Sequence, residues 1–418
     1  MMSATPNVQT GALPLAGLRV LELGHIVAGP AAGQILADLG ADVIKIENVD
    51  GGDQVRQMPG AMASMFSMLN RNKRSLAVDL RGEGAEVFRR LAARSDVVID
   101  NFSYEAMDRL GLGYRTMSAL YPQLVWLTIK GFLPGPREAQ PMLDELAQMA
   151  GGLAFMTGTA DKPSRAGASV IDLGAATYGV VAVLAALRQR DANGGQGQLI
   201  TAGLFETSVY LVGQWMANAQ HEDAPSVPLA TMQQGKRMGF SIYQLFDTAD
   251  ASKVFLGITS NAHWQRFCAA LELPDLAADS RFLTVDARVE HRNELVETLT
   301  AILRRHTQAE LDARLEPAGV PFAPVRRPDQ LHEETHLRES GQLLATPLAN
   351  GRIGDLPKLP VRSSTFDMTL RAPPPLLGGD TQDVLAELGY SEEQVAGLHE
   401  CGAIGLPGDL RDASSGRH

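Results

Sequence analysis

Two stretches of the chain hold side chains whose types and spacing suit chemistry. The stretch "LHEETH" (331–336) contains His332, Glu333 and His336. On a helix this His-Glu-x-x-His spacing places two imidazoles on one face beside a glutamate, the arrangement of many zinc hydrolases. The stretch "RAGASVIDLGAA" (165–176) places Asp172 at the start of a long apolar segment.

The His-Glu-x-x-His stretch lacks the remaining parts of a zinc site. Catalytic zinc needs three protein ligands and one open coordination position. Glu339 and Gln342 occupy the positions at which one protease family continues with Gly-x-x-His, and residues 345–386 contain no glutamate. The surrounding residues are polar on every side, which is typical of a solvated helix. We therefore expect no metal site here.

Asp172 is the better candidate for chemistry, although it has a simple structural interpretation. Its carboxylate would be partly desolvated, yet it lies near a helix N-terminus, which favours negative charge. Aspartate is also a favoured N-cap residue. On the local sequence alone, the N-cap is the interpretation that we favour.

The composition is that of an ordinary globular enzyme. The chain has 418 residues, enough for two domains, with 45% hydrophobic and 20% charged residues. A net charge of -11 argues against general affinity for nucleic acid or an anionic membrane. Cys268 and Cys401 are far apart and form neither a metal motif nor a disulfide framework. We find no secretory signal and no apolar run long enough to span a membrane, so we expect a cytoplasmic protein.

Alternating strand and helix patterns predict an α/β fold. Short apolar runs such as "LRVLELG" (18–24) and "DVIKIE" (42–47) are separated by helical patterns, which predicts a parallel sheet with helices on both faces. Neither a G-x-G-x-x-G motif after the first strand nor a P-loop motif occurs, so the dinucleotide fingerprint is absent. From about residue 225 the pattern changes, and "SIYQLFDTADASKVFLGIT" (241–259) predicts two antiparallel strands.

Several ordered stretches are similar to the class III coenzyme A transferases, the family that includes formyl-CoA transferase and the carnitine CoA-transferases. The similarity covers the first two hundred residues well, the last fifty moderately and residues 225–330 poorly. The stretches that carry it are "GLRVLELGHIVAGPAAGQILADLGADVIKIE" (17–47), "LNRNKRSLAVDL" (69–80), "DVVIDNFSYEAMDRLGLGY" (96–114), "LVWLTIKGF" (124–132), "GASVIDLGAATYGVVAVLAAL" (167–187), "GGQGQLI" (194–200) and "APPPLLGGDT" (372–381).

The resemblance implies a reaction centred on Asp172. In this family the aspartate at this position attacks the acyl-CoA thioester and forms a mixed anhydride. The released CoA thiolate converts the anhydride into an aspartyl-CoA thioester, and the acceptor acid takes up the CoA through a second anhydride. Because an anhydride hydrolyses readily, the carboxylate must be ionised, fixed and shielded from bulk water. Coenzyme A is therefore a substrate, and no permanently bound cofactor is expected.

The resemblance also implies which residues bind CoA and the acyl group. Val27 replaces a glutamine of formyl-CoA transferase, so specificity for oxalate and formate is not expected, and Leu143 replaces a tyrosine. Arginines suit the phosphates of CoA because they bond in a bidentate way, and Arg137 would replace a phosphate-binding lysine. The expected binding residues are His25, Val27, Ala28, Val78, Arg81, Asn101, Phe102, Arg109 and Arg137, with Gln233, Gln234 and Gly235 in a loop that covers the active site.

Simple structural roles stay open for four residues in these stretches. In these alternatives Lys73 and Arg74 are surface charges. His25 is a structural histidine whose hydrogen bonds are satisfied at a strand end, and Phe102 is a core side chain.

Two other functions stay open. The family shares its fold with α-methylacyl-CoA racemase, in which a histidine in the preceding segment is paired with the aspartate for proton transfer. This sequence has no histidine between His25 and His221, which argues against a racemase. A non-catalytic CoA-binding protein would not need Asp172.

The stretch after "KGFLPGP" (130–136) is more similar to family members that use small dicarboxylic acids. We expect succinyl-CoA as the donor and itaconate, mesaconate, citramalate or malate as the acceptor. Transfer between two carboxyl groups of one dicarboxylate would look the same in the sequence. Arg137, Lys236 or Arg237 would bind the distal carboxylate.

The resemblance implies an architecture that periodicity does not reveal. Residues 1–220 would form a Rossmann-like large CoA-binding domain, residues 225–325 a smaller α+β domain, and residues 330–418 a segment that returns to the large domain. Family members are interlocked homodimers, so a homodimer is expected here.

Overall fold

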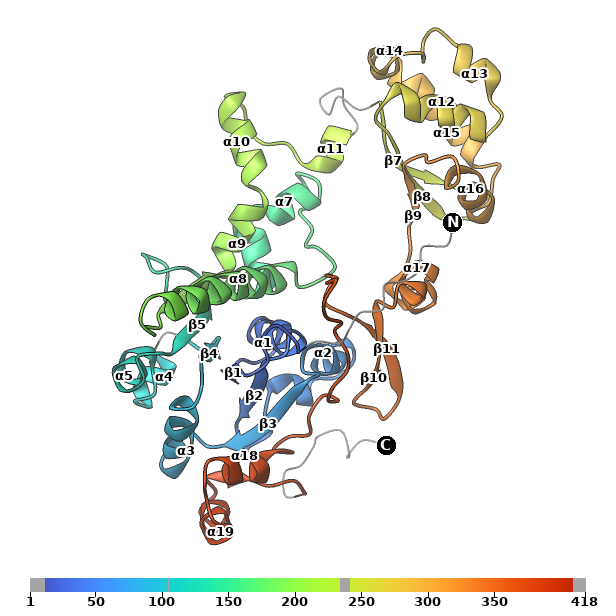
Figure 1. Ribbon diagram of the computed structural model, residues 1–418. Coiled ribbons are helices and arrows are strands. Elements are labelled where there is room, and N and C mark those ends of the chain that lie inside the picture. Colours follow the sequence, from blue (N-terminus) through green and yellow to red (C-terminus); the bar gives the residue numbers. More distant parts are fainter. Residues whose placement is uncertain (1–11, 104, 234–240, 409–418) are drawn as a thin grey trace. The chain divides into compact units, whose positions relative to one another are not determined.

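The computed structural model describes residues 12–103, 105–233 and 241–408, which divide into two compact units (Figure 1). Unit 1 comprises the chain up to Ala154, the segment Arg165–Trp215 and the chain from Thr335 onward. Unit 2 comprises Phe155–Ser164 and Met216–Glu334. Each unit has a hydrophobic core of its own.

The centre of unit 1 is a sheet of β1 (Arg19–Glu22), β2 (Asp42–Glu47), β3 (Lys73–Val78), β4 (Val97–Asp100), β5 (Val125–Lys130), β6 (Leu199–Gly203) and β12 (Ile404–Gly405). The strand order is β12-β3-β2-β1-β4-β5-β6. All strands are parallel except the short edge strand β12, which runs antiparallel to β3. The predicted α/β class with a large parallel sheet is confirmed.

Helices cover both faces of this sheet, because side chains of each strand alternate between the two faces. Val20 of β1 belongs to one buried cluster, with side chains of α1 and α8. Its neighbour Leu21 belongs to a second cluster, with side chains of α3, α5 and α18. The helices of unit 1 outside the C-terminal part are η1 (Gln54–Gln57), α1 (Ala28–Asp38), α2 (Ala61–Leu69), α3 (Glu83–Ala92), α4 (Ala106–Arg109), α5 (Tyr114–Leu120), α6 (Asp144–Ala150), α8 (Val170–Ala192) and α9 (Leu204–Leu211).

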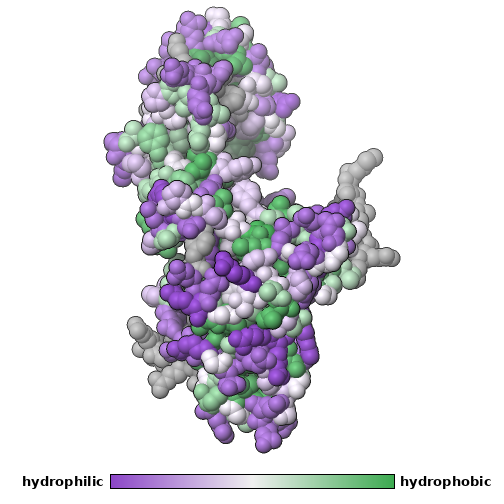
Figure 2. Space-filling view, turned by 90° about the vertical axis from the view of Figure 1, so that its left-hand side faces the viewer, coloured by the Kyte–Doolittle hydropathy of each residue, from purple (hydrophilic) through white to green (hydrophobic). Residues whose placement is uncertain are grey.

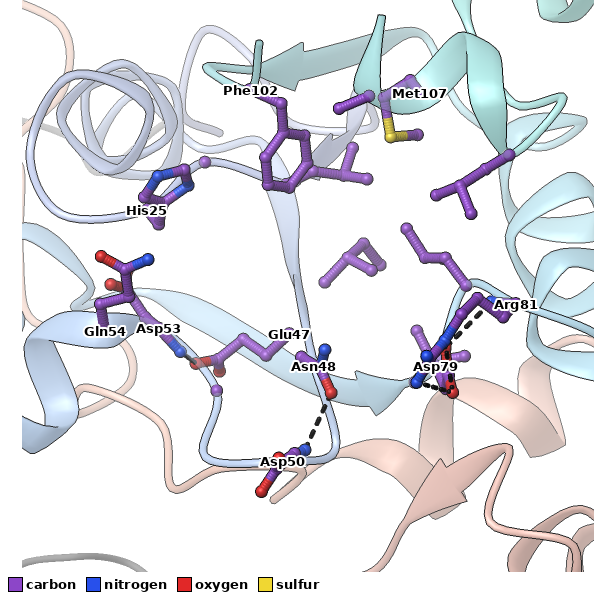
Figure 3. A pocket seen from close by; sticks show the side chains of 18 residues that line it. His25, Glu47, Asn48, Asp50, Asp53, Gln54, Asp79, Arg81, Phe102 and Met107 are labelled. Atoms are coloured by element: carbon purple, nitrogen blue, oxygen red, sulfur yellow. Dashed lines mark hydrogen bonds and ion pairs between the residues drawn. The ribbon is translucent and has the colours of Figure 1, made fainter.

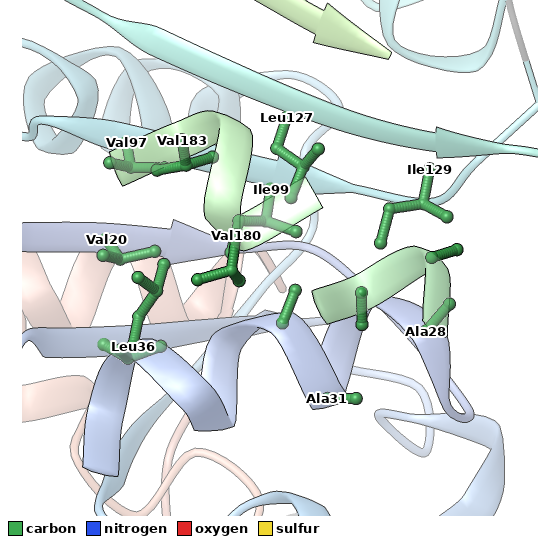
Figure 4. Close-up of a cluster of buried hydrophobic side chains, with 14 of the residues drawn as sticks. Val20, Ala28, Ala31, Leu36, Val97, Ile99, Leu127, Ile129, Val180 and Val183 are labelled. Carbon is green, nitrogen blue, oxygen red and sulfur yellow. The ribbon is translucent and has the colours of Figure 1, made fainter. Parts of the chain in front are cut away.

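The long helix α8 packs closely on α1 and on the strands β5 and β6 (Figure 4). A Cβ atom at Gly179 would lie 3.0 Å from both methyl carbons of Leu127, so a glycine permits this close approach. No membrane span was expected from the sequence, but α8 is long and apolar enough to be one by length and composition alone. Soluble core helices pass the same test, and Ile171, Val180 and Val183 of this helix are buried in the first cluster.

The C-terminal part of unit 1 begins with α17 (Thr335–Glu339) and the antiparallel pair β10 (Leu343–Pro347) and β11 (Ile353–Pro357), and ends with α18 (Thr381–Glu387) and α19 (Glu392–Glu400). Between them the chain follows the edge of the large sheet. The Asn72 N–H donates to the Ala372 carbonyl, and the Ser75 N–H donates to the Asp380 carboxylate. These contacts attach residues 371–381 to β3.

Unit 2 is built on the antiparallel strands β7 (Ile242–Asp247), β8 (Lys253–Ile258) and β9 (Phe322–Pro324). The hairpin β7–β8 is the one that the sequence predicted. Trp264, Phe267 and Leu299 lie in the buried core on one face of the sheet. The helices are α11 (Leu229–Gln233), α12 (Asn261–Ala270), α13 (Pro274–Ala278), α14 (Val285–Glu290), α15 (Arg292–Leu303), α16 (Gln308–Leu315) and η3 (Pro328–Glu333), while α7 (Leu153–Thr157) and α10 (Gly213–His221) each begin in unit 1 and end in unit 2.

The His-Glu-x-x-His stretch is not one helix, contrary to expectation. The 3-10 helix η3 ends at Glu333, and α17 begins at Thr335. Glu334 between them has an extended backbone with ψ 123°. The spacing of a single helix face therefore does not apply to His332 and His336.

Arg288 provides a test of the core of unit 2. Its side chain is fully buried and donates hydrogen bonds to the Ser241 hydroxyl, the Phe282 carbonyl and the Asn261 side-chain oxygen. Arg288→Ala leaves these acceptors unpaired, so we expect it to lower the free energy of unfolding by about 3 kcal/mol in urea titrations. The exposed Arg281→Ala is the matched control, with an expected loss below about 1 kcal/mol. Equal losses in both variants would contradict this account.

Candidate active site

Asp172 lies in the first turn of α8 but does not cap it. The N-cap residue is Ser169, whose side chain makes no capping hydrogen bond. The N–H groups of Ile171 and Asp172 instead donate to one carboxylate oxygen of Asp144, at 2.8 and 3.0 Å. The interpretation of Asp172 as an N-cap aspartate is therefore wrong, because a carboxylate from α6 caps the helix.

This capping leaves the Asp172 side chain available. Among the residues that the structure describes, none forms a hydrogen bond or an ion pair with its carboxylate. Burial, together with the negative charges of Asp144 and Glu145, raises the pKa of Asp172 to about 7. The group is therefore a partly buried carboxylate of unusual basicity, as a nucleophile requires.

A cavity of about 560 Å³ opens at the carboxyl ends of β1, β2 and β3 (Figure 3). Ligands of open α/β sheets bind in such crevices. His25, Val78, Arg81 and Phe102, four of the residues that the resemblance assigned to CoA, line it. The rings of His25 and Phe102 lie beside each other, with centroids 5.4 Å apart.

Asn101 and Asp53 hold the loop between β1 and α1 beside this cavity. The Asn101 side chain accepts the His25 N–H at 3.0 Å and donates to the His25 carbonyl at 2.9 Å. Asp53 accepts the N–H of Ile26, whose φ of 66° is strained for a β-branched residue. Asn101 therefore positions the loop and does not itself line the cavity.

A buried network of charges lies beneath the same loop. The Lys45 ammonium contacts Glu22, Asp53 and the Gly24 carbonyl. The Lys73 ammonium donates to Glu22 at 2.7 Å and to the Pro30 carbonyl at 2.9 Å, on the other side of the loop. Burial lowers the pKa of Lys73 to about 8, although Glu22 opposes this shift. The network therefore fixes both ends of the loop.

Lys73 is thus not a surface charge, contrary to the open alternative. The residue is only 2% exposed. Arg74 is partly exposed and pairs with Asp42 and Glu387, so it supports the C-terminal part of unit 1. Charged residues inside apolar strands were the signal for this network, because they are seldom buried unless paired. Neither Asp53 nor Asp144 was identified from the sequence.

The remaining predicted residues lie outside the cavity or outside the described residues. Val27 and Ala28 are buried at the N-terminus of α1. Arg109 ends α4, exposed to solvent, and does not line the cavity. Gln233 ends α11 in unit 2, while Gln234, Gly235, Lys236 and Arg237 lie outside the described residues.

Two arginines of unit 1 present their guanidinium groups at the surface. Arg81 lines the cavity and pairs with Asp79 at 2.8 Å. Arg137 lies over the rings of Phe132 and Phe205, with its guanidinium carbon 4.4 and 5.5 Å from their centroids. Both are able to bind an anionic ligand.

Comparisons with known proteins show the family to which the chain belongs. The family model of CoA-transferase family III matches residues 15–381. Succinyl-CoA:glutarate CoA-transferase of Mus musculus is 32% identical over 406 residues, covering 94% of this chain and 90% of that protein. Succinyl-CoA--D-citramalate CoA-transferase of Chloroflexus aurantiacus is 30% identical, covering 92% and 96%.

A solved structure supports the same family. The crystal structure of a CAIB/BAIF family protein from Brucella suis matches with a TM-score of 0.79 at 31% identity, covering 90% of this chain and all of that one. The resemblance seen in the sequence is therefore confirmed, and the chain belongs to CoA-transferase family III and is a CoA-transferase.

Proposed function

We propose that Asp172 is the nucleophile through which this enzyme moves CoA from an acyl-CoA to a carboxylic acid. An Asp172 oxygen attacks the thioester carbonyl, the carbon–sulfur bond breaks, and the CoA thiolate leaves with its electron pair. The thiolate then attacks the Asp172 carbonyl and releases the donor acid. The acceptor carboxylate reverses these two steps, which restores Asp172 and yields the new acyl-CoA.

The state of the Asp172 carboxylate is the observation that carries this proposal. It has no hydrogen-bond partner among the described residues, it is partly buried, and its pKa is raised to about 7. Each property increases the nucleophilicity of a carboxylate, and burial also protects an anhydride from water. A racemase would need a proton-transfer partner, and no histidine lies between His25 and His221.

The cavity beside β1–β3 is the proposed place for the nucleotide end of CoA. Its apolar lining, which includes Val78, Leu80 and Met107, suits the adenine ring. Arg81 suits a phosphate, to which it would turn from Asp79. The helix α1, which follows the loop at the cavity, packs along α8, so the cavity and Asp172 belong to adjoining elements of unit 1.

We further propose succinyl-CoA as the donor and a small dicarboxylate as the acceptor. The names of the two relatives above both contain succinyl-CoA, with glutarate and D-citramalate as the second substrate. Itaconate, mesaconate, citramalate and malate belong to the same chemical class. Arg137 is the candidate in unit 1 for the distal carboxylate, since its guanidinium is exposed and held over two aromatic rings.

Chemical trapping tests the nucleophile. After incubation with succinyl-CoA, hydroxylamine should modify the peptide 166–188, whose only carboxylate side chain is that of Asp172. We expect intact-protein and peptide mass spectrometry to show the modification in the wild type and in Asp191→Asn, at the exposed end of α8, but not in Asp172→Asn. CoA binding without trapping, for every acyl-CoA of a panel, would falsify the proposal.

The pH dependence provides a second test. Because Asp172 reacts only when ionised, kcat/KM should rise as the pH increases through about 7 and then level off. The folded-state pKa lies above the ordinary value of about 3.9. The wild type should therefore lose stability relative to Asp172→Asn between about pH 4 and about pH 7, with a constant difference above that. A kcat/KM profile that is level down to about pH 5 would contradict this assignment.

A homodimer is part of the same proposal. Tyr178 and Val181 of α8 and Tyr210 and Leu211 of α9 are exposed by 43, 61, 73 and 43%. Green patches of hydrophobic residues also interrupt the hydrophilic face drawn in Figure 2. Exposed apolar patches of this kind are typical of interfaces, and a second copy of the chain is the partner that the family resemblance implies.

Native mass spectrometry tests the dimer. We expect the wild type to be a dimer and Val181→Glu/Tyr210→Glu to lose it, because two carboxylates would be buried in the interface. Leu120→Glu, on the exposed face of α5, is the control and should remain dimeric. A monomeric wild type at micromolar concentration would overturn the proposed dimer.

A further inference from the structure

Two side chains of α6 hold both ends of the segment that leads to Asp172. Asp144 accepts the N–H groups of Ile171 and Asp172 through one carboxylate oxygen. Gln148 accepts the Ala166 N–H through its amide oxygen, at 2.8 Å. The amide nitrogen of Gln148 donates to the other oxygen of Asp144, which joins the two contacts.

The geometry of this pair determines which hydrogen-bond donors the Asp144 carboxylate meets. The Ala166 N–H fixes the Gln148 amide so that its NH₂ group faces Asp144. Both oxygens of Asp144 then accept hydrogen bonds, and among the residues that the structure describes neither oxygen faces an acceptor. Asp144 is 4% and Gln148 0% exposed, so water cannot replace these contacts. Asp144 is therefore held as a hydrogen-bond acceptor through both oxygens, as a carboxylate anion is, whereas the Asp172 carboxylate has no partner among the described residues.

We propose that Asp144 and Gln148 form a positioning pair that keeps a permanent negative charge behind Asp172 and thereby sets the reactivity of its carboxylate. Neither residue needs to touch the substrate. The inference rests on the proposed role of Asp172 as the nucleophile. Gln148, by its orientation alone, assigns the fixed charge to Asp144.

This arrangement suits an exchange between a carboxylate and a thiolate. An ordinary aspartate has a pKa of about 3.9 and a thiol has a pKa of about 8.5, so the carboxylate is a far weaker base than the thiolate. The mixed anhydride therefore reverts readily to the thioester when the thiolate attacks it. The negative charge of Asp144 makes Asp172 more basic and so reduces the difference in basicity between its carboxylate and the thiolate. The carbon–oxygen bond of the anhydride then forms at a smaller free-energy cost, with no proton transfer in the step.

Other ionisable groups near α8 are already paired or lie outside this pair. Glu145 adds to the negative charge near Asp172, although it is exposed and bound to Arg165. Burial lowers the pKa of His25, in the loop before α1, so this residue is neutral. The remaining groups on packed elements are Asp38 of α1, paired with Arg71, Lys130 of β5, paired with Asp100, and Glu206 of α9, which accepts the Leu133 N–H.

Exchanging the carboxylate at position 144 with the amide at position 148 tests the effect of the negative charge separately from the effect of the hydrogen bonds. In Asp144→Asn alone, two amide NH₂ groups face each other, so we expect a lower melting temperature. In Asp144→Asn/Gln148→Glu, the amide introduced at position 144 still accepts the α8 N–H groups and donates to the carboxylate introduced at position 148, which still accepts the Ala166 N–H. The hydrogen bonds persist, but the negative charge moves one helical turn along α6, away from the α8 N–H groups.

We expect this double variant to regain the wild-type melting temperature and to give the hydroxylamine adduct on Asp172. The midpoint of its kcat/KM–pH profile should fall by about one pH unit or more. Its single-turnover rate of adduct formation above pH 8 should fall at least about tenfold, since its nucleophile is less basic. A double variant that folds but keeps the wild-type midpoint and rate would overturn the positioning pair while leaving Asp172 as the nucleophile. Absence of the adduct in the wild type would instead remove the proposed function.

A measurement on the wild type covers the case in which the double variant does not fold. With ¹³C-labelled aspartate carboxyls assigned by Asp144→Asn and Asp172→Asn spectra, the Asp172 signal should titrate near pH 7. In Asp144→Asn the midpoint of the Asp172 signal should fall by about one pH unit or more. An unchanged Asp172 midpoint in Asp144→Asn would overturn the proposal.

Discussion

The contact between the Asp144 carboxylate and the first N–H groups of α8 is the interaction on which the site depends. A helix N-terminus needs acceptors for its free N–H groups, and here the acceptor comes from another helix. This leaves Asp172, in the same turn, with a carboxylate that has no partner in the described part of the chain and lies near a second negative charge. Burial of two such groups is tolerated because Asp144 makes hydrogen bonds through both oxygens, and because α8 is anchored along its length on α1, β5 and β6.

A second buried network plays the corresponding role at the cavity. Glu22, Lys45 and Lys73 lie in the centre of the parallel sheet, and their desolvation is offset only because every charge has a partner. The two ammonium groups each also bind a backbone carbonyl, one on each side of the His25–Ala28 loop. The strained conformation of Ile26 persists because Asp53 holds its N–H group. At Asp172 and at the cavity, buried charged groups therefore fix the backbone through hydrogen bonds. In both places the free-energy cost of desolvating these groups offsets part of the stability that the hydrogen bonds provide.

The sequence allowed prediction of the elements but not of the contacts between them. The strands of unit 1 follow from apolar runs that are buried on both faces, and the β7–β8 hairpin follows from two runs around a polar turn. Asp172 was identified by its place before an apolar helix and by family resemblance. Its neighbour Asp144 was missed, because the two are far apart in sequence and only the packing of α6 on α8 brings them together. Lys73 was open to interpretation as a surface charge for the same reason, since its partner Glu22 lies on another strand. The expectation of a single helix at the His-Glu-x-x-His stretch was wrong, because the backbone is extended at Glu334 between two short helices.

An isotope experiment tests the central claim most directly, because it follows the oxygen atoms. When an acceptor labelled with ¹⁸O in its carboxylate takes up CoA through an Asp172 anhydride, one of its oxygens remains on Asp172. After turnover with succinyl-CoA, the tryptic peptide 166–188 should therefore contain ¹⁸O, and the peptide that contains Asp144 should not. Label in the acyl-CoA product with none in the peptide 166–188 would contradict covalent catalysis by Asp172.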